Sequence, residues 1–154
     1  MQIFISYNSR DISLVRRISQ QIGCLADVKF WDQDKMPGEA VWDQIYDWIE
    51  DSDLVLALIT DNSIDRAMAV SHELTHAKEL DKPIIPLVAH NVPDSDLGFL
   101  SGITYIRIDK DNPGFALEQL ARHIQKLKGD EIRNMLLILG GIIFFIWLMR
   151  KPSA

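Results

Sequence analysis

The sequence predicts an α/β fold in which a five-stranded parallel sheet carries helices on both faces, followed by a C-terminal transmembrane helix. Short apolar runs alternate with amphipathic segments of helical period, the pattern of a parallel sheet with helical crossovers. One central run, Leu54–Ile59, is apolar without a break, as a strand covered on both faces must be. Residues 135–149 are all apolar or glycine, which is unlike one face of a soluble helix.

Composition limits the classes of protein and partner. The 154 residues suffice for one folded domain, and the net charge is −6 without a basic run before the last residues. We therefore expect no nucleic-acid partner. Cys24 is the single cysteine, so no internal disulfide can form, and the chain goes straight from its first strand into a polar loop. These features predict a cytosolic domain.

The first half of the chain contains two predicted strands and two helices. A polar loop at residues 7–11 follows the first strand and offers helix-capping side chains, and Gly23 is placed to end the helix that comes next. The Pro-Gly pair at 37–38 marks a turn in an exposed loop. In order, we expect strand Gln2–Ser6, a helix with Ile12, Val15, Ile18 and Ile22 inward, strand Val28–Trp31, loop Asp32–Gly38, and helix Glu39–Glu50 with Val41, Ile45, Trp48 and Ile49 inward.

The second half continues the alternation. Thr60–Ala69 is a longer connection that leads to a helix, and Pro83 follows that helix where it should end. The last strand alternates apolar and polar residues, which is typical of a sheet edge. In order, we expect strand Leu54–Ile59, helix Ser71–Leu80, strand Ile84–Val88, edge strand Thr104–Ile108, and helix Phe115–Lys128.

The expected strand order is the flavodoxin-like 2-1-3-4-5. In such sheets ligands bind outside the carboxyl ends of the strands, where the order reverses between the first and third strands. Three segments should wall that crevice: Tyr7–Asp11, Thr60–Ser63 and the start of the helix that carries Glu73.

The stretch Ser71–Leu80 holds a literal HExxH motif, in which His72 and His76 would hold zinc and Glu73 would activate water. Helical periodicity favours a different arrangement, with Leu74 and Ala77 inward, Glu73 on the flank, and both histidines facing water. No ligand helix follows to supply a third metal ligand. We therefore expect no metal site here, although the metalloprotease stays an alternative.

Residues 135–149 predict a membrane anchor. The segment is about 22 Å long as a helix, against about 30 Å for a hydrocarbon core, so flanking basic residues must reach the interface. Trp147, Arg150 and Lys151 form such a border, and the more numerous basic residues upstream favour a cytoplasmic domain. A buried helix of the fold or an oligomer contact is the alternative. The expected organisation is a folded domain at 1–128, a juxtamembrane linker at 129–134, a transmembrane helix at 135–149 and a tail at 150–154.

Four motifs in the right order resemble the Toll/interleukin-1 receptor (TIR) domain family, across residues 2–128. They are the first-strand motif IFISYNSRD, the loop WDQDKMPGEA after the second strand, the third strand DSDLVLALIT, and the glutamate-leucine pair within SHEL. The resemblance implies the five-stranded flavodoxin-like fold. In the enzymatic branches of the family it also implies cleavage of the nicotinamide–ribose bond of NAD, with Glu73 as the catalytic carboxylate and no cofactor besides NAD as substrate.

The sequence departs from this family just before the glutamate. Ala69 and Val70 stand where the family often has tryptophan and a small or sulfur-containing residue, so the aromatic wall of the pocket is either missing or supplied elsewhere, by Trp31 or Trp42. The remaining candidate substrate-binding residues are Tyr7, Asn8 and Arg10, the last suited to a phosphate, and Asp34 and Met36 on a loop that could gate entry.

The sequence is consistent with three functions. The first is a membrane-anchored TIR enzyme that cleaves NAD in a bacterial defence response and yields nicotinamide with either ADP-ribose or a cyclised signal. Its partners would be membrane lipid, NAD and further copies of the chain. The second is a non-catalytic TIR adaptor that acts by homotypic contacts. The third is the HExxH zinc metalloprotease.

Overall fold

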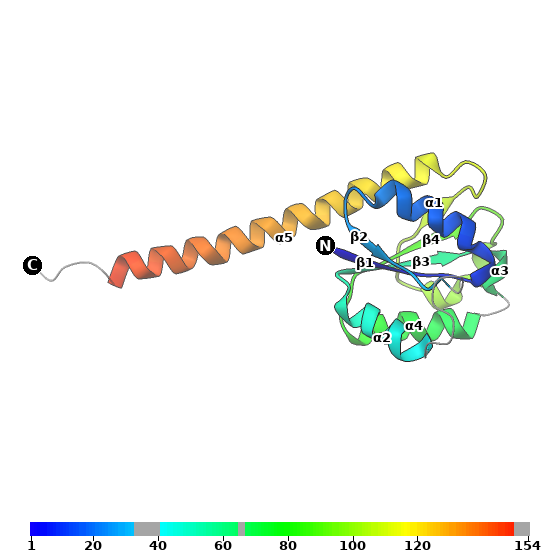
Figure 1. Ribbon diagram of the computed structural model, residues 1–154, viewed down its shortest axis with the longest axis horizontal. Coiled ribbons are helices and arrows are strands. Elements are labelled where there is room, and N and C mark those ends of the chain that lie inside the picture. The colour runs from blue at the N-terminus through cyan, green and yellow to red at the C-terminus, as the bar shows by residue number, and fades with distance from the viewer. Residues whose placement is uncertain (33–40, 65–66, 150–154) are drawn as a thin grey trace, which may run out of the picture. The chain divides into compact units, whose positions relative to one another are not determined.

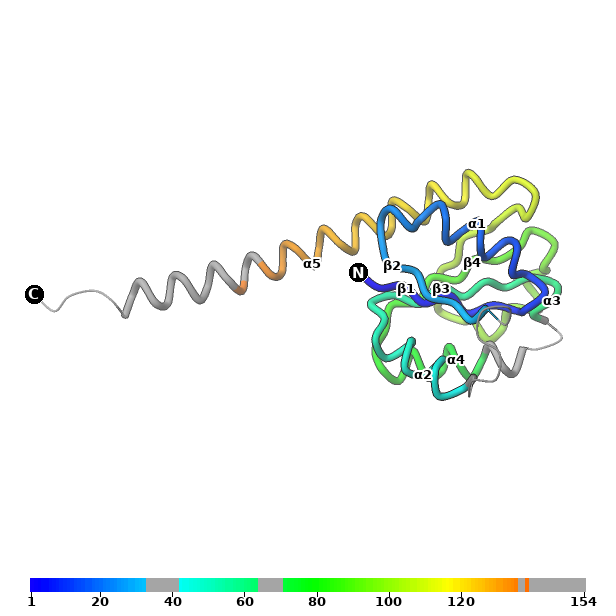
Figure 2. Tube along the Cα trace, viewed as in Figure 1, coloured from blue at the N-terminus to red at the C-terminus, as the bar shows by residue number. Residues whose placement is uncertain are grey.

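The computed structural model describes residues 1–32, 41–64 and 67–149, with the side chains of 41, 64, 67–70, 136, 137 and 139–149 left aside. Figure 2 traces the chain and draws the remaining residues in grey. The chain forms two compact units, Met1–Ala121 and Arg122–Ala154. The first unit contains the complete sheet and therefore every strand discussed below.

The sheet has five parallel strands in the order β2-β1-β3-β4-β5, which confirms the expected flavodoxin-like topology (Figure 1). β1 pairs with β3 such that Ser6 lies beside Ala57. β1 is thus flanked on both sides by other strands, and its last residue lies within the sheet. The strands are β1 Gln2–Ser6, β2 Asp27–Lys29, β3 Leu54–Ile59, β4 Ile84–Ala89 and β5 Ile106–Ile108.

Helices cover both faces of the sheet, as predicted. α1 and the first residues of α5 lie over one face, whereas α2 and α4 lie over the other (Figure 1). Three short 3-10 turns occur in the connections: η1 lies between β1 and α1, and η2 and η3 lie between β4 and β5. The helices are α1 Ile12–Ile22, α2 Val41–Asp51, α3 Asp61–Ile64, α4 Ala67–Glu79 and α5 Gly114–Met149, and the turns are η1 Ser9–Asp11, η2 Asp94–Asp96 and η3 Gly98–Leu100.

Alternation along β1 decides what each of its side chains faces. Phe4 packs with Ile45 and Ile49 of α2 and with Ala77 of α4, so it lies on the face that these two helices cover. Side chains two residues apart in a strand point to the same face. Ser6 therefore faces the α2 and α4 side, and it does so at the end of the strand.

Several element boundaries differ from the expected ones. β2 ends at Lys29 and leaves Trp31 outside the strand, since the carbonyl oxygen of Trp31 accepts a hydrogen bond from the Tyr7 hydroxyl. β5 begins at Ile106, after Tyr105, whose hydroxyl bonds the Asp94 carboxylate at 2.8 Å. α4 begins at Ala67, four residues before the expected start at Ser71, so Glu73 lies in its second turn.

The last helix runs without interruption. α5 extends from Gly114 to Met149, so the residues expected to form a linker, 129–134, are helical. A search of the described residues found no helix with the length and hydropathy needed to cross a membrane. The side chains of residues 139–149 lie outside that description, and the membrane anchor stays a prediction.

Candidate active site

Glu73 is a largely buried carboxylate beside the end of β1. It projects from α4 toward the sheet, and the Ser6 hydroxyl donates a hydrogen bond to its Oε2. Burial raises the pKa of Glu73 above its ordinary value, and the hydrogen bond from Ser6 lowers it in part. A carboxylate with a raised pKa at the carboxyl edge of a parallel sheet is the kind of group that enzymes use for chemistry.

The aromatic side chains near this edge come from three elements. Trp31 packs against Trp48 of α2, with 6.2 Å between ring centroids, and both contact the cluster that contains Ala77. Ala77 lies one helical turn after Glu73 on α4. Trp42 is 51% exposed and contacts Tyr46 instead. Of the two tryptophans expected to supply an aromatic wall, the structure therefore brings Trp31 to the Glu73 side.

The polar residues after β1 have different environments. Tyr7 is half-buried, and its ring packs edge-to-face with that of Phe30. Its hydroxyl donates a hydrogen bond to the Trp31 carbonyl oxygen. Asn8 is buried and caps η1, accepting a hydrogen bond from the Arg10 backbone N–H at 3.1 Å. Arg10 is exposed. These three residues lie at the carboxyl end of the sheet as expected, and their contact with a substrate stays a prediction.

The predicted gating residues, Asp34 and Met36, lie outside the described residues. The chain is fixed just before them by Asp32, which is 3% exposed. Arg16 of α1 binds both oxygens of this carboxylate, at 3.1 and 2.9 Å. Both hydrogen bonds come from one nitrogen, Nη2, and a charge-assisted pair of this kind is stronger than a hydrogen bond between neutral groups. Arg16 and Asp32 thus hold the end of the segment that contains Trp31.

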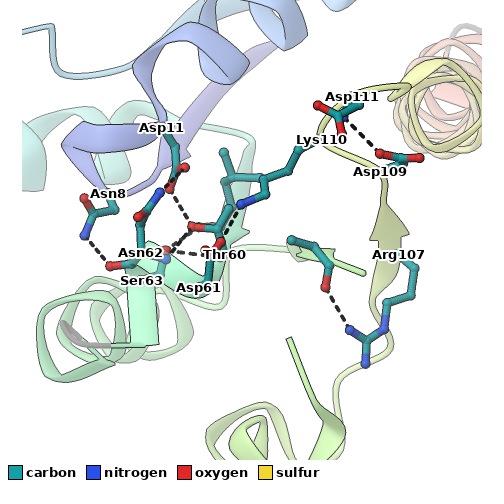
Figure 3. Close-up of polar contacts among 12 residues, drawn as sticks. Asn8, Asp11, Thr60, Asp61, Asn62, Ser63, Arg107, Asp109, Lys110 and Asp111 are labelled. Carbon is teal, nitrogen blue, oxygen red and sulfur yellow. Dashed lines mark hydrogen bonds and ion pairs between the residues drawn. The ribbon is translucent and has the colours of Figure 1, made fainter. Parts of the chain in front are cut away.

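Sequence reasoning missed a polar network that joins the loops after β1 and β3 (Figure 3). Asp11 is 5% exposed and accepts hydrogen bonds from Thr60 Oγ1 at 2.6 Å and Asn62 Nδ2 at 2.7 Å. The Asn8 side chain donates to the Asn62 carbonyl oxygen at 2.7 Å. The two loops are therefore fastened together on the α1 side of the crevice. Their polar composition was visible in the sequence, but their pairing was not.

The expectation that both HExxH histidines face water is wrong for His76. His72 is exposed, whereas His76 lies between α4 and α2, with its ring 4.7 Å from that of Tyr46. Its Nε2 is 3.7 Å from a carboxylate oxygen of Glu50. Within the described part of the chain, no group of three or more His, Cys, Asp or Glu side chains is arranged to hold a metal ion.

Comparisons with known proteins agree with this architecture. A family model described as TIR domain matches residues 3–124. The CMP N-glycosidase BcmB of Clostridium botulinum has a similar structure, with a TM-score of 0.55 and 18% identity, covering 78% of this chain and 98% of that one. A 2-deoxyribosyltransferase of Bacillus psychrosaccharolyticus has a TM-score of 0.54 and 18% identity, covering 73% of this chain and 89% of that one. Among curated proteins, none matches.

The Asp11 network predicts a stability effect. Asp11→Ala should lower the free energy of unfolding by about 2 kcal/mol, because the buried Thr60 hydroxyl and the partly buried Asn62 amide lose their acceptor. Urea denaturation followed by circular dichroism measures this change. Asp96→Ala, at an exposed carboxylate, is the matched control and should change stability by less than about 0.5 kcal/mol. Equal stability of the two variants would contradict the structural role of Asp11.

Proposed function

The chain belongs to the TIR domain family, and from that premise we propose that it cleaves the bond between nicotinamide and ribose in NAD. The observation that carries the proposal is the buried Glu73 carboxylate at the carboxyl edge of the sheet, held by Ser6. The names of the two similar structures, an N-glycosidase and a deoxyribosyltransferase, support chemistry at a glycosidic bond. The setting we propose is a bacterial defence response.

The reaction needs one negative charge beside the ribose. As the bond between C1′ and the nicotinamide nitrogen breaks, both electrons leave with nicotinamide and the ribose becomes an oxocarbenium-like cation. The Glu73 carboxylate stabilises that cation in a site with little water. Water then attacks C1′, its oxygen forms the new bond, and one proton is released, which yields ADP-ribose.

The arrangement of carboxylates favours NAD over a neutral nucleoside. Most glycosidases use two carboxylates, one of which protonates the leaving group. Nicotinamide in NAD already carries positive charge and leaves as a neutral molecule, so no acid is needed. Asp11, the other buried carboxylate after β1, has its two oxygens bonded to Thr60 and Asn62. Among the described residues, Glu73 is thus the carboxylate at this edge that is not bonded to another loop, which fits a cationic leaving group.

The remaining contacts in the proposal come from the carboxyl edge of the sheet. Arg10 is exposed there and its guanidinium suits a phosphate of the dinucleotide. Tyr7, Asn8 and Trp31 would line the same crevice. Asp34 and Met36 would act on entry, as the sequence predicts. NAD is the substrate, and the proposal includes no separate cofactor.

The raised pKa of Glu73 links activity and stability to pH in opposite directions. The reaction needs the ionised carboxylate, so kcat/KM should fall as pH drops through this raised pKa. A carboxyl group whose pKa is higher in the folded than in the unfolded state favours folding while it is protonated. That contribution is lost as pH rises through the folded-state pKa. In its ionised form, Glu73 therefore costs stability.

Glu73→Gln should remove activity without weakening the fold. Nicotinamide release by the full chain should fall by at least about 100-fold, because the variant keeps the shape but not the charge. The melting temperature at pH 7 should stay the same or rise, because a buried charge is gone. The control is Glu79→Gln, an exposed glutamate on the same helix. Undiminished release by Glu73→Gln would reject the assignment, and absence of release by the natural chain would favour the non-catalytic adaptor.

We further propose that residues 135–149 attach the chain to a membrane, with the TIR domain on the cytoplasmic side. The family match ends at residue 124, before this segment. Apolar side chains of the described part of α5 are already exposed before residue 139, at Ile132, Met135 and Ile138, with 55%, 55% and 65% of their surface accessible. Large exposed apolar side chains in sequence call for a partner that covers them.

Deletion of residues 134–154 tests the anchor. The full chain should float with liposomes in a density gradient, whereas the shortened chain should stay with the buffer. Circular dichroism and the melting temperature of the shortened chain should match those of the full chain, because all strands lie upstream of the deletion. A shortened chain that is insoluble or melts much earlier would show that this segment belongs to the fold.

Attachment to a surface should also control the rate through self-association. Confinement raises the effective concentration of neighbouring copies without any new interface. We expect nicotinamide release per molecule to rise at least about tenfold as surface density on vesicles increases. Glu73→Gln at the same density gives the background. A rate per molecule that stays flat across densities would reject the requirement for assembly while leaving the chemistry of Glu73 untouched.

A further inference from the structure

Ser6 has an unusual position for a polar residue. It is the last residue of β1, it is 2% exposed, and β1 lies between β2 and β3 in the sheet. A buried hydroxyl needs a hydrogen-bond partner, since an unsatisfied one costs stability. Ser6 finds that partner in the side chain of Glu73, which lies 67 residues later in the chain.

The two oxygens of Glu73 differ in their contacts. Oε2 accepts the hydrogen bond from Ser6 Oγ. From the described residues, no hydrogen bond reaches Oε1. One oxygen is therefore held from the sheet, while the other accepts no hydrogen bond from the described residues.

The chemical type of the partner matters as well. Among the described residues, no lysine, arginine or histidine forms an ion pair with Glu73. A cationic partner would neutralise the carboxylate and so weaken its attraction for a positively charged ribose. A serine hydroxyl donates a hydrogen bond without adding charge. It can therefore fix the direction of the carboxylate and leave its charge available.

We propose that Ser6 is the positioning residue of the active site, which holds Oε2 of Glu73 and presents Oε1 to the ribose of the substrate. This inference rests on the proposed function, because it assigns Ser6 through the role of Glu73. Ser6 itself does not touch the reacting atoms. It acts by restricting the rotamer of Glu73 and by favouring its ionised form.

The electrostatics of Glu73 agree with this role. Burial raises the pKa of this carboxyl, and the Ser6 hydrogen bond opposes that rise. Removing the hydroxyl should thus raise the pKa of Glu73 further and shrink its ionised fraction at mildly acidic pH. A residue that only fills space in the strand would have no such effect on titration.

Ser6→Ala in the full chain tests the inference through the pH profile of kcat/KM for nicotinamide release. On the acidic limb of the profile we expect about a tenfold lower kcat/KM than for the natural chain, since a hydrogen bond to a charged group is lost. The deficit should narrow as pH rises, because Glu73 then ionises without help. Any deficit in kcat/KM that persists at high pH measures the loss of orientation of the Glu73 carboxylate. This deficit should appear in kcat rather than in KM.

Two further variants make the test specific. Ser6→Thr keeps a hydroxyl and should restore the acidic limb of the profile. Ser52→Ala is the matched control, because Ser52 is also 2% exposed and its hydroxyl donates to the Ile49 carbonyl oxygen at 2.8 Å, before β3 begins. Ser52→Ala should lower stability about as much as Ser6→Ala does, but it should leave the acidic limb of the kcat/KM profile unchanged. An acidic limb that is identical in Ser6→Ala and Ser52→Ala would overturn the inference.

A substrate-free measurement separates this inference from the proposed function. The side-chain carboxyl of Glu73 can be titrated by ¹³C NMR and assigned by its absence in Glu73→Gln. In Ser6→Ala its midpoint should move to higher pH than in the natural chain, whether or not NAD is cleaved. An unchanged midpoint rejects the role of Ser6. A moved midpoint without any nicotinamide release rejects the proposed reaction and, with it, the presentation of Oε1 to a ribose.

Discussion

The parallel pairing of β1 with β3 is the constraint on which the candidate site depends. Their register places Ser6 beside Ala57, so the two strands end at nearly the same level and release their following loops at one edge. Beyond that edge the chain leaves β1 toward α1 on one face, whereas the segment after β3 leads to α4 on the other (Figure 1). The gap between diverging connections is where open α/β sheets bind ligands. Glu73 lies at this edge of the sheet because α4 packs on the side to which Ser6 points.

The two carboxylates at this edge of the sheet, Asp11 and Glu73, are held in different ways. On the α1 side, Asp11 is satisfied by Thr60 and Asn62, so a buried carboxylate there serves to join two loops. On the α4 side, Glu73 has one neutral partner and a raised pKa. Both oxygens of Asp11 accept hydrogen bonds from the protein, whereas among the described residues only Oε2 of Glu73 does so. Functional sites commonly retain groups of the second kind at some cost in stability.

Much of this fold was accessible from the sequence because its signals are local. The unbroken apolar run of β3 and the helical period of α1 predicted buried elements correctly, and the alternation of strands and helices predicted the order of the sheet. Glu73 was placed at the edge of the core by helical period alone. Long-range pairings were not accessible in the same way. The sequence did not indicate that Asp11 would accept a hydrogen bond from Thr60, or that the His76 ring would pack against Tyr46 of α2. Periodicity describes which face of one helix is apolar, but it does not identify the neighbouring element.

The neutral hydroxyl beside Glu73 has a consequence for inhibition. A carboxylate that is oriented but not neutralised attracts a cation of the right shape. Ring compounds that carry a permanent positive charge in place of the ribose oxocarbenium would therefore bind better than neutral nucleosides of equal size, since transition-state mimics gain most from such groups. Selectivity against enzymes that pair their carboxylate with a lysine or arginine would follow from charge alone. The Ser6 hydroxyl, at the end of a central strand, would thus influence which inhibitors bind beside Glu73.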